Sequence, residues 1–262
     1  MPTLDTRGKI AAAQIAFYVP IAIVSLLLIF RYLFRRDAGW FFLFIFSGLR
    51  IAEGALVVAG QMTPANPTLI QVAYIIDYAG LFAIILSLLG FIGMAGQHTY
   101  SEVHSVVVSL RTTGFLVLGG LGVGIAGGVI GIQKNANESL ATGLRRAGVC
   151  IFAGAYVLQF LLHIVAWSYR WQLRTYRRHL LIGITFAFPF LGVRIADAVL
   201  AAWSSSDLLG TQPSANAVLA KFNPVTGNWV LFLVLDVIME WVVAALYLFA
   251  STVLAQRTHH HH

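Results

Sequence analysis

The chain has 262 residues, of which 59% are hydrophobic and only 10% are charged, and its mean hydropathy is +0.82. Soluble domains carry about 25% charged residues, so this composition excludes a soluble globular domain and indicates an all-α membrane protein. The net charge of +7 comes from basic residues near the ends of apolar runs. That placement is typical of a membrane-orientation signal, and we expect no nucleic-acid partner.

Seven apolar runs are long enough to cross a bilayer, which takes about 20 residues. They predict one seven-helix transmembrane domain over residues 1–258, with helices at about 11–33, 40–60, 68–94, 113–132, 147–171, 180–203 and 229–254. Residues 259–262 are histidines and are interpreted as a tag remnant. The longest connection, Ser204–Asn228, is rich in Ser, Asn and Pro; we expect a solvated loop, and the alternative is a cover over the bundle mouth.

Basic residues divide unequally between the two sides of the predicted bundle. Nine lie on one side: Arg31, Arg35, Arg36, Arg111, Arg170, Arg174, Arg177, Arg178 and Arg257. Six lie on the other: Arg7, Lys9, Lys134, Arg145, Arg146 and Lys221. The bias predicts a lumenal or extracellular N-terminus and a cytosolic C-terminus, in an endomembrane such as the endoplasmic reticulum or in the plasma membrane. The sequon Asn137-Glu138-Ser139 falls on the predicted outer side.

Two charged pairs fall at membrane depth in matching contexts. Phe46-Ser-Gly-Leu-Arg-Ile-Ala-Glu-Gly-Ala-Leu56 carries Arg50 and Glu53, and Phe190-Leu-Gly-Val-Arg-Ile-Ala-Asp-Ala-Val-Leu200 carries Arg194 and Asp197. A charge at the centre of a membrane helix costs about 2.5–3.5 kcal/mol on insertion scales, so both pairs need compensating contacts. The simpler interpretation makes the arginines internal clamps that fix helix packing.

The similarity extends to the next predicted helices. Asn66-Pro67 precedes a span that carries Asp77, and Asn223-Pro224 precedes a span that carries Asp236. This predicts two parallel three-helix repeats joined by the fourth helix, related by an axis along the membrane normal. The linker would be the glycine-rich helix with Gly119, Gly120, Gly122, Gly124, Gly127 and Gly128. Chance similarity between two Leu- and Ala-rich helices is the alternative.

Acids outnumber arginines inside the predicted bundle. Arg50 and Arg194 face five carboxyl groups, those of Glu53, Asp77, Asp197, Asp236 and Glu240. A formal charge of −3 at this depth requires protonated carboxyls, a bound cation or a ligand. Asp236 and Glu240 are four residues apart on one helix face, so we expect them to titrate as a coupled pair.

Several further side chains are candidates for lining a binding cavity. The fifth span carries a stripe of Tyr156, Gln159 and His163, and a lone histidine of this kind is more often a packed polar residue than a ligand. Aromatic residues near the charged positions include Tyr74, Tyr78, Phe186 and Trp241. Packing in the core or against lipid is the usual role of such aromatics, and a cavity lining is the alternative.

Three segments carry a resemblance to a known family. They are Gly39-Trp-Phe-Phe-Leu-Phe-Ile-Phe-Ser-Gly-Leu-Arg50, Phe188-Pro-Phe-Leu-Gly-Val-Arg194 and Phe222-Asn-Pro-Val-Thr-Gly-Asn-Trp229, the last followed by Met239-Glu240. Together they resemble a family of seven-span membrane proteins from filamentous fungi that are mostly described as uncharacterised. The resemblance implies the topology and a fungal source but no activity.

Better-known seven-span classes lack their functional residues here. The last span has no Schiff-base lysine for retinal, and only His163 is intramembrane, which is too few histidines for a zinc hydrolase or for axial haem ligation. The third span ends without an Asp-Arg-Tyr-like motif of a G-protein-coupled receptor. We therefore expect no metal and no cofactor.

In size and span count the chain is similar to the small integral-membrane terpene and meroterpenoid cyclases of fungi. This similarity implies acid-initiated cyclisation of a lipophilic prenyl substrate, taken from the membrane lipid, with Asp236, Glu240, Asp77 and Glu53 as catalytic candidates. Substrate-binding candidates are Arg50, Arg194, Asp197, Tyr74, Tyr78, His163, Phe186 and Trp241. The alternative is a non-enzymatic receptor or transporter in which the same charges form a binding site.

Overall fold

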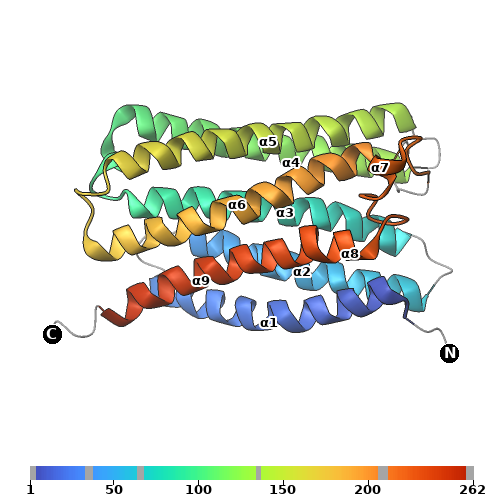
Figure 1. Cartoon of the computed structure of the whole chain (residues 1–262), viewed down its shortest axis with the longest axis horizontal. Coiled ribbons are helices and arrows are strands. Elements are labelled where there is room, and N and C mark those ends of the chain that lie inside the picture. The colour runs from blue at the N-terminus through green and yellow to red at the C-terminus, as the bar shows by residue number, and fades with distance from the viewer. Residues whose placement is uncertain (1–3, 33–37, 64–67, 134–136, 206–211, 258–262) are drawn as a thin grey trace.

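The computed structural model describes residues 4–32, 38–63, 68–133, 137–205 and 212–257. Within these residues seven helices are long and apolar enough to cross a membrane, which confirms the predicted all-α, seven-helix architecture. The helices lie side by side in one bundle, and α1 begins and α9 ends at its opposite ends (Figure 1). The predicted tag remnant lies outside the described residues, as do five further residues of the sequence analysis: Arg35, Arg36, Lys134, Asn66 and Pro67.

Six membrane-spanning helices are continuous and the seventh is composite. The six are α1 (Thr6–Tyr32), α2 (Ala38–Met62), α3 (Thr68–Ala95), α4 (His104–Ile132), α5 (Glu138–Ser168) and α6 (Thr175–Trp203). The seventh span joins α8 (Trp229–Leu231), the π-helical segment η3 (Phe232–Ile238) and α9 (Met239–Arg257). Two short elements, η2 (Tyr100–Glu102) and α7 (Ala217–Ala220), lie in the connections.

The largest differences from the predicted boundaries are at the starts of α4 and α5. Both helices begin nine residues before the apolar run that predicted them, at His104 and Glu138. Hydropathy detects only the apolar part of a helix, whereas its hydrogen bonding continues through polar ends. The Asn137 side chain caps α5 by accepting a hydrogen bond of 3.2 Å from the Leu140 backbone N–H.

The seven spans form a closed ring, in which α3 is the most deeply buried member. Each span packs against the next one along the chain, and α9 closes the ring against α1. Helix α3 also contacts α5 and α6, and eight consecutive residues, Leu81–Leu88, are buried. A helix buried on all its faces has neighbours on every side, so this part of α3 lies within the core of the bundle.

Glycines allow α4 and α5 to approach closely. A Cβ atom at Gly127 would lie 2.8 Å from the Ala141 carbonyl oxygen, and one at Gly120 would lie 2.9 Å from the Phe152 ring. Positions Gly119 and Gly122, on another face of α4, have open space around them. Small residues at helix contacts are a common means of packing in lipid, as predicted for this helix.

Candidate functional site

The charged residues converge at one depth, although they come from four helices. Arg50 is twelve residues from the end of α2, Asp77 nine from the start of α3, and Arg194 nine from the end of α6. At 1.5 Å per residue these positions lie about 13–18 Å from the end of the bundle at which α1 begins. We refer to that end as the N-terminal side. The cluster therefore lies between that membrane surface and the bilayer centre.

Arg50 is buried and contacts acids from three helices. Its Nη1 donates to Glu53, three residues further along α2, and to Asp77 Oδ1 at 2.7 Å. Its Nη2 donates to Glu240 and lies 3.8 Å from Asp236 Oδ1. The guanidinium of Arg50 thus links α2 to α3 and to the seventh span.

Arg194 repeats this arrangement from the opposite side of the cluster. Its Nε lies 2.8 Å from Asp236 Oδ1 and 2.7 Å from Glu240 Oε1. Its Nη2 donates to Asp77 Oδ1 at 3.0 Å, and Nη1 lies 3.8 Å from Asp197 Oδ2. Asp236 and Glu240 therefore contact the same guanidinium.

The contacts of the two arginines correspond to one another. Each arginine pairs with the acid three residues further along its own helix, with the aspartate of the next membrane span, and with an acid from the other half of the chain. This pattern is the one that two superposable halves would produce. The superposition itself stays a prediction.

Carboxyl groups are in excess in the cluster. Among the described residues it contains two guanidinium groups and five carboxyl groups, a formal charge of −3 if all were ionised. The second oxygen of Glu240, Oε2, is buried and has no hydrogen-bond partner within the described part of the chain. Uncompensated charge is costly at this depth, so the site is suited to hold protons or a positively charged guest.

Gln14 of α1 belongs to the cluster, although the sequence analysis did not predict it as a site residue. Its Nε2 donates to Glu53 Oε2 at 3.2 Å and to the Arg50 carbonyl oxygen at 3.3 Å. Gln14 is eight residues from the start of α1 and Glu53 is nine residues from the end of α2, so the two side chains lie at similar depths. Comparing depths from the N-terminal side would have identified it as a partner.

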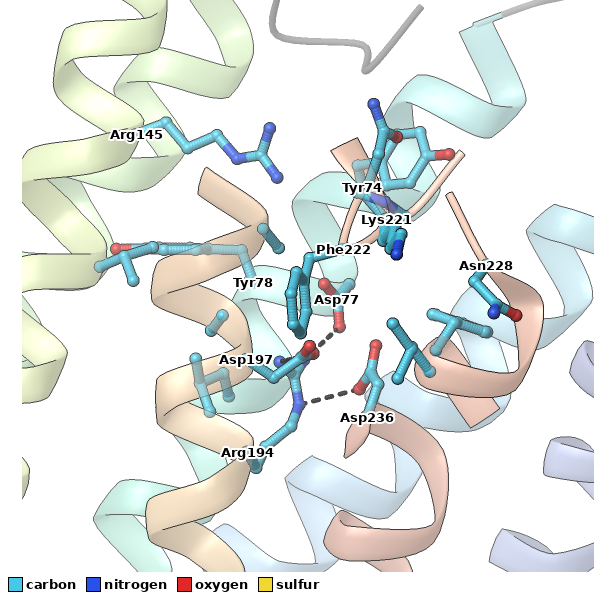
Figure 2. Close-up of a pocket in the computed structure, with 18 residues that line it drawn as sticks. Tyr74, Asp77, Tyr78, Arg145, Arg194, Asp197, Lys221, Phe222, Asn228 and Asp236 are labelled. Carbon is cyan, nitrogen blue, oxygen red and sulfur yellow. Dashed lines mark hydrogen bonds and ion pairs between the residues drawn. The ribbon is translucent and has the colours of Figure 1, made fainter. Parts of the chain in front are cut away.

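A polar cavity of about 50 Å³ opens above the cluster, towards the N-terminal side. Its floor carries Asp77, Asp197, Asp236 and Arg194 (Figure 2). Its upper part is lined by Tyr74, Tyr78, Arg145, Lys221, Phe222, Asn223 and Asn228. A cavity needs about 10–15 Å³ of such volume to hold one water, so this one has room for about three to five waters.

The segment that covers the cavity was expected to be a solvated loop. That expectation is wrong for Lys221–Asn228, which lines the cavity and includes the fully buried Asn223. The Asn223 Oδ1 accepts from the backbone N–H groups of Val225 and Thr226, at 2.8 and 3.1 Å. Arg7 of α1 donates to the Gly227 carbonyl oxygen at 2.9 Å, which ties this cover to the first helix.

Asp236 lies inside the π-helical segment η3. Such segments are rare and are frequent at functional sites, because the wider turn changes the direction of side chains relative to an α-helix. Here the seventh span presents both Asp236 and Glu240 to Arg194, one on the cavity floor and the other fully buried below it.

Large aromatic side chains close the cluster from below. Phe46 lies one turn from Arg50, with the guanidinium 5.7 Å from its ring centroid. Tyr18 packs edge-on against Phe46 at 5.5 Å, and Tyr247 packs against Phe91 at 5.1 Å, all of them buried. On the side of the cluster away from the cavity the bundle is therefore filled by buried aromatic side chains.

The structure brings most, but not all, of the predicted site residues together. Tyr74 and Tyr78 line the cavity with the charged residues. Phe186 is 63% exposed on the bundle surface, and Trp241 packs edge-on against Phe17 at 6.0 Å, so neither lines it. His163 is buried between α5 and α6, where its Nε2 accepts from Trp167 Nε1 at 2.9 Å.

Within the described residues, no group of three or more His, Cys, Asp and Glu side chains could hold a metal ion.

Comparisons with known proteins give a family but no activity. Neither a curated protein nor a solved structure matches the chain. Residues 4–257 match one family model, and the chain therefore belongs to the family described as "Domain of unknown function (DUF7702)".

Proposed function

We propose that this membrane protein binds a small positively charged group in the cavity above the charged cluster, as a receptor or a transporter does. The observation that carries the proposal is the polar cavity itself, whose floor holds three carboxyl groups, those of Asp77, Asp197 and Asp236, beside the single guanidinium of Arg194. A cation on this floor would offset part of the excess of carboxyl groups. It would also gain charge-assisted hydrogen bonds away from bulk water.

The size and lining of the cavity favour a small polar guest. Space for about three to five waters accommodates an ammonium group with a short linker, but not a folded polyene. A primary ammonium has three N–H donors, and the acids of the floor are acceptors when ionised. The Tyr74 and Tyr78 rings complete a lining that suits an organic cation.

Acid-initiated cyclisation of a prenyl substrate is the second candidate. It is favoured by the excess of carboxyl groups and by four aromatic residues at the cavity: Tyr74, Tyr78, Phe222 and Phe232. A carboxyl proton, from Asp236 or Glu240, would add to one alkene carbon, and a second double bond would attack the cation. A carboxylate, Asp77 or Glu53, would then take a proton, so that the product is an isomer of the substrate.

Binding of ethylammonium to protein in lipid nanodiscs tests the first proposal. We expect saturable binding that weakens by about tenfold or more in Asp77→Asn and Asp197→Asn, because each removes a negative charge from the floor. Glu138→Gln is the matched control, since it removes an acid from the exposed first turn of α5. Uptake into proteoliposomes separates a transporter from a receptor.

Two results would overturn the binding proposal. One is ethylammonium binding that is equal in wild type and in both aspartate variants. The other is formation of an isomeric product from a prenyl substrate that is lost in Asp236→Asn or Glu240→Gln. The second result establishes the cyclase instead.

A further inference from the structure

The lining of the cavity carries charges of both signs in equal number. Its carboxyl groups are those of Asp77, Asp197 and Asp236, and its basic groups are those of Arg145, Arg194 and Lys221. A simple cation uses only the carboxyl groups of this lining. A guest that carries both a positive and a negative group uses both sets and adds no net charge to the cavity.

The two signs are separated along the cavity. Figure 2 shows Arg145 and Lys221 in its upper part and the carboxyl groups below them. Arg145 extends from α5 towards the cavity, whereas Lys221 belongs to the cover and is exposed. On α3, Tyr74 of the upper part is three residues from Asp77 of the floor, or about 4.5 Å along the helix. The cavity therefore has a basic upper part and an acidic floor about one helical turn apart.

The carboxylates of the floor have more acceptor positions than Arg194 occupies. Arg194 contacts Oδ1 of Asp77 at 3.0 Å and Oδ1 of Asp236 at 2.8 Å, and it lies 3.8 Å from Asp197 Oδ2. Each carboxylate has two oxygens with about four lone-pair sites between them. The Asp77 side chain, which is 29% exposed, is the most open of the three. An ammonium group above the floor can therefore donate to carboxylate oxygens without displacing Arg194.

We propose that the cavity binds a short amino acid as its zwitterion, with the ammonium and the carboxylate at opposite ends of the molecule. The ammonium lies on the floor at Asp77 and Asp197, and the carboxylate pairs with Arg145 and Lys221 in the upper part. A guanidinium binds a carboxylate through two parallel, charge-assisted hydrogen bonds. This inference rests on the proposed function, because its ammonium is the positively charged group on the floor, and it adds an anionic end to the guest.

β-Alanine has the charge separation that this arrangement requires. It is ethylammonium with a carboxylate added to its methyl carbon, and its ammonium nitrogen lies about 4 Å from its carboxylate carbon. Its ammonium end fits the space for about three to five waters, and its carboxylate reaches the upper part, where Lys221 is exposed. L-Alanine has the same atoms but carries both charged groups on one carbon, so it does not reach both levels of the cavity.

Competition binding to the full chain in lipid nanodiscs tests the inference, with radiolabelled β-alanine as the probe. The unlabelled competitors are ethylammonium, which lacks the carboxylate, propionate, which lacks the ammonium, and L-alanine, which lacks the separation. We expect β-alanine to bind at least about tenfold more tightly than each of the three. Ethylammonium binding is also measured directly, so that the floor is assayed independently of the probe.

Substitutions in the upper part should affect the two ligands in opposite directions. Arg145→Gln should weaken β-alanine binding by at least about tenfold, and Lys221→Gln by about threefold, because the exposed lysine is screened by salt. Both variants should tighten ethylammonium binding, since each removes a charge of the same sign as the guest. A purely structural role would weaken both ligands together. Lys9→Gln removes an exposed lysine at the same end of the bundle and is the matched control.

Equal competition by L-alanine or by ethylammonium would overturn the inference. An unchanged ratio of β-alanine to ethylammonium affinity in Arg145→Gln would also overturn it, and if that variant does not fold, Lys221→Gln is judged by the same criterion. Ethylammonium binding without any β-alanine binding would remove this inference and leave the proposed function in place. Tighter binding of propionate than of β-alanine would assign the cavity to anions and overturn both.

Discussion

Arg194 of α6 donates from Nη2 to Oδ1 of Asp77 in α3 at 3.0 Å, across a sequence separation of 117 residues. The same carboxylate oxygen accepts from Arg50 Nη1 at 2.7 Å. One aspartate therefore joins the two arginines that the sequence places in equivalent positions. Removing any member of this group leaves a buried charge without its partner.

Replacing Arg50 should destabilise the bundle strongly. Arg50→Gln removes the guanidinium that faces four carboxyl groups, and breaking a buried ion pair costs about 3–5 kcal/mol. Arg50→Lys should recover only part of this loss, because an ammonium cannot reach the same set of acceptors. Thermal unfolding in detergent micelles measures the change. The control is Arg111→Gln, on an exposed position of α4, and equal stability of the two variants would refute the role of Arg50.

Gln14 should contribute as a hydrogen-bond donor. Gln14→Leu removes the N–H groups that donate to Glu53 and to the Arg50 carbonyl oxygen. A buried acceptor that loses its hydrogen-bond donor costs about 1–3 kcal/mol of stability. The unfolding midpoint should fall relative to wild type. Gln172→Leu, in the exposed turn before α6, serves as the control. A wild-type midpoint for Gln14→Leu would show that Gln14 contributes nothing to the cluster.

The cover of the cavity should loosen when Arg7 is changed. Arg7→Gln loses the bond to the Gly227 carbonyl oxygen and the stacking of the guanidinium on Phe232, at 5.7 Å. Hydrogen exchange should become faster in Lys221–Asn228 while α2 stays protected. Lys9→Gln changes an exposed charge on the same helix and should have no effect. Unchanged exchange of the cover in Arg7→Gln would mean that it is held by other contacts.

The two halves of the chain should superpose. We expect residues 11–94 and 147–254 to be related by a near two-fold axis along the membrane normal, with Arg50 on Arg194 and Asp77 on Asp236. Superposition in an experimental structure measures this directly. If α2 and α3 do not align on α6 and the seventh span, the similarity of the two charged segments is coincidental.

The orientation in the membrane is open to a simple test. We expect a reporter fused after Arg257 to be cytosolic and Asn137 to be glycosylated in a host that modifies sequons. Replacing Asn137 with Gln is the control for the modification. A reporter found on the lumenal or extracellular side would reverse the orientation.

Hydropathy was sufficient to predict the spans, and charge counting identified the core of the site. Arg50, Glu53, Asp77, Arg194, Asp197, Asp236 and Glu240 were all found because a charge inside an apolar run needs a partner. Gln14 was not predicted as a site residue, because a neutral amide lowers the hydropathy of an apolar run only slightly and carries no charge that needs a partner. Arg145 and Lys221 were not predicted to line the cavity, because they lie at the ends of spans, where basic residues were interpreted only as orientation signals.

The remaining errors concern direction around the helix axis and the path of loops. Phe186 and Trp241 lie at suitable depths but point away from the cavity, and hydropathy carries little information on which face of an apolar helix is internal. The cover over the cavity depends on Asn223 folding its own backbone and on Arg7 from the other end of the chain. A contact across 220 residues has no signature in local sequence.

The seventh span carries Asp236 in its π-helical segment and Glu240 at the start of α9, and it is synthesised after the other six spans. Arg50, Glu53 and Asp77 enter the membrane with the first three helices and can pair among themselves, whereas Arg194 arrives later with only Asp197 on its own helix. The acids that lie closest to Arg194 belong to the seventh span and emerge from the ribosome after the other six spans. Docking of the seventh span therefore completes the ion pairs of both arginines, and a chain that stops before residue 229 is expected to be recognised by quality control as incomplete.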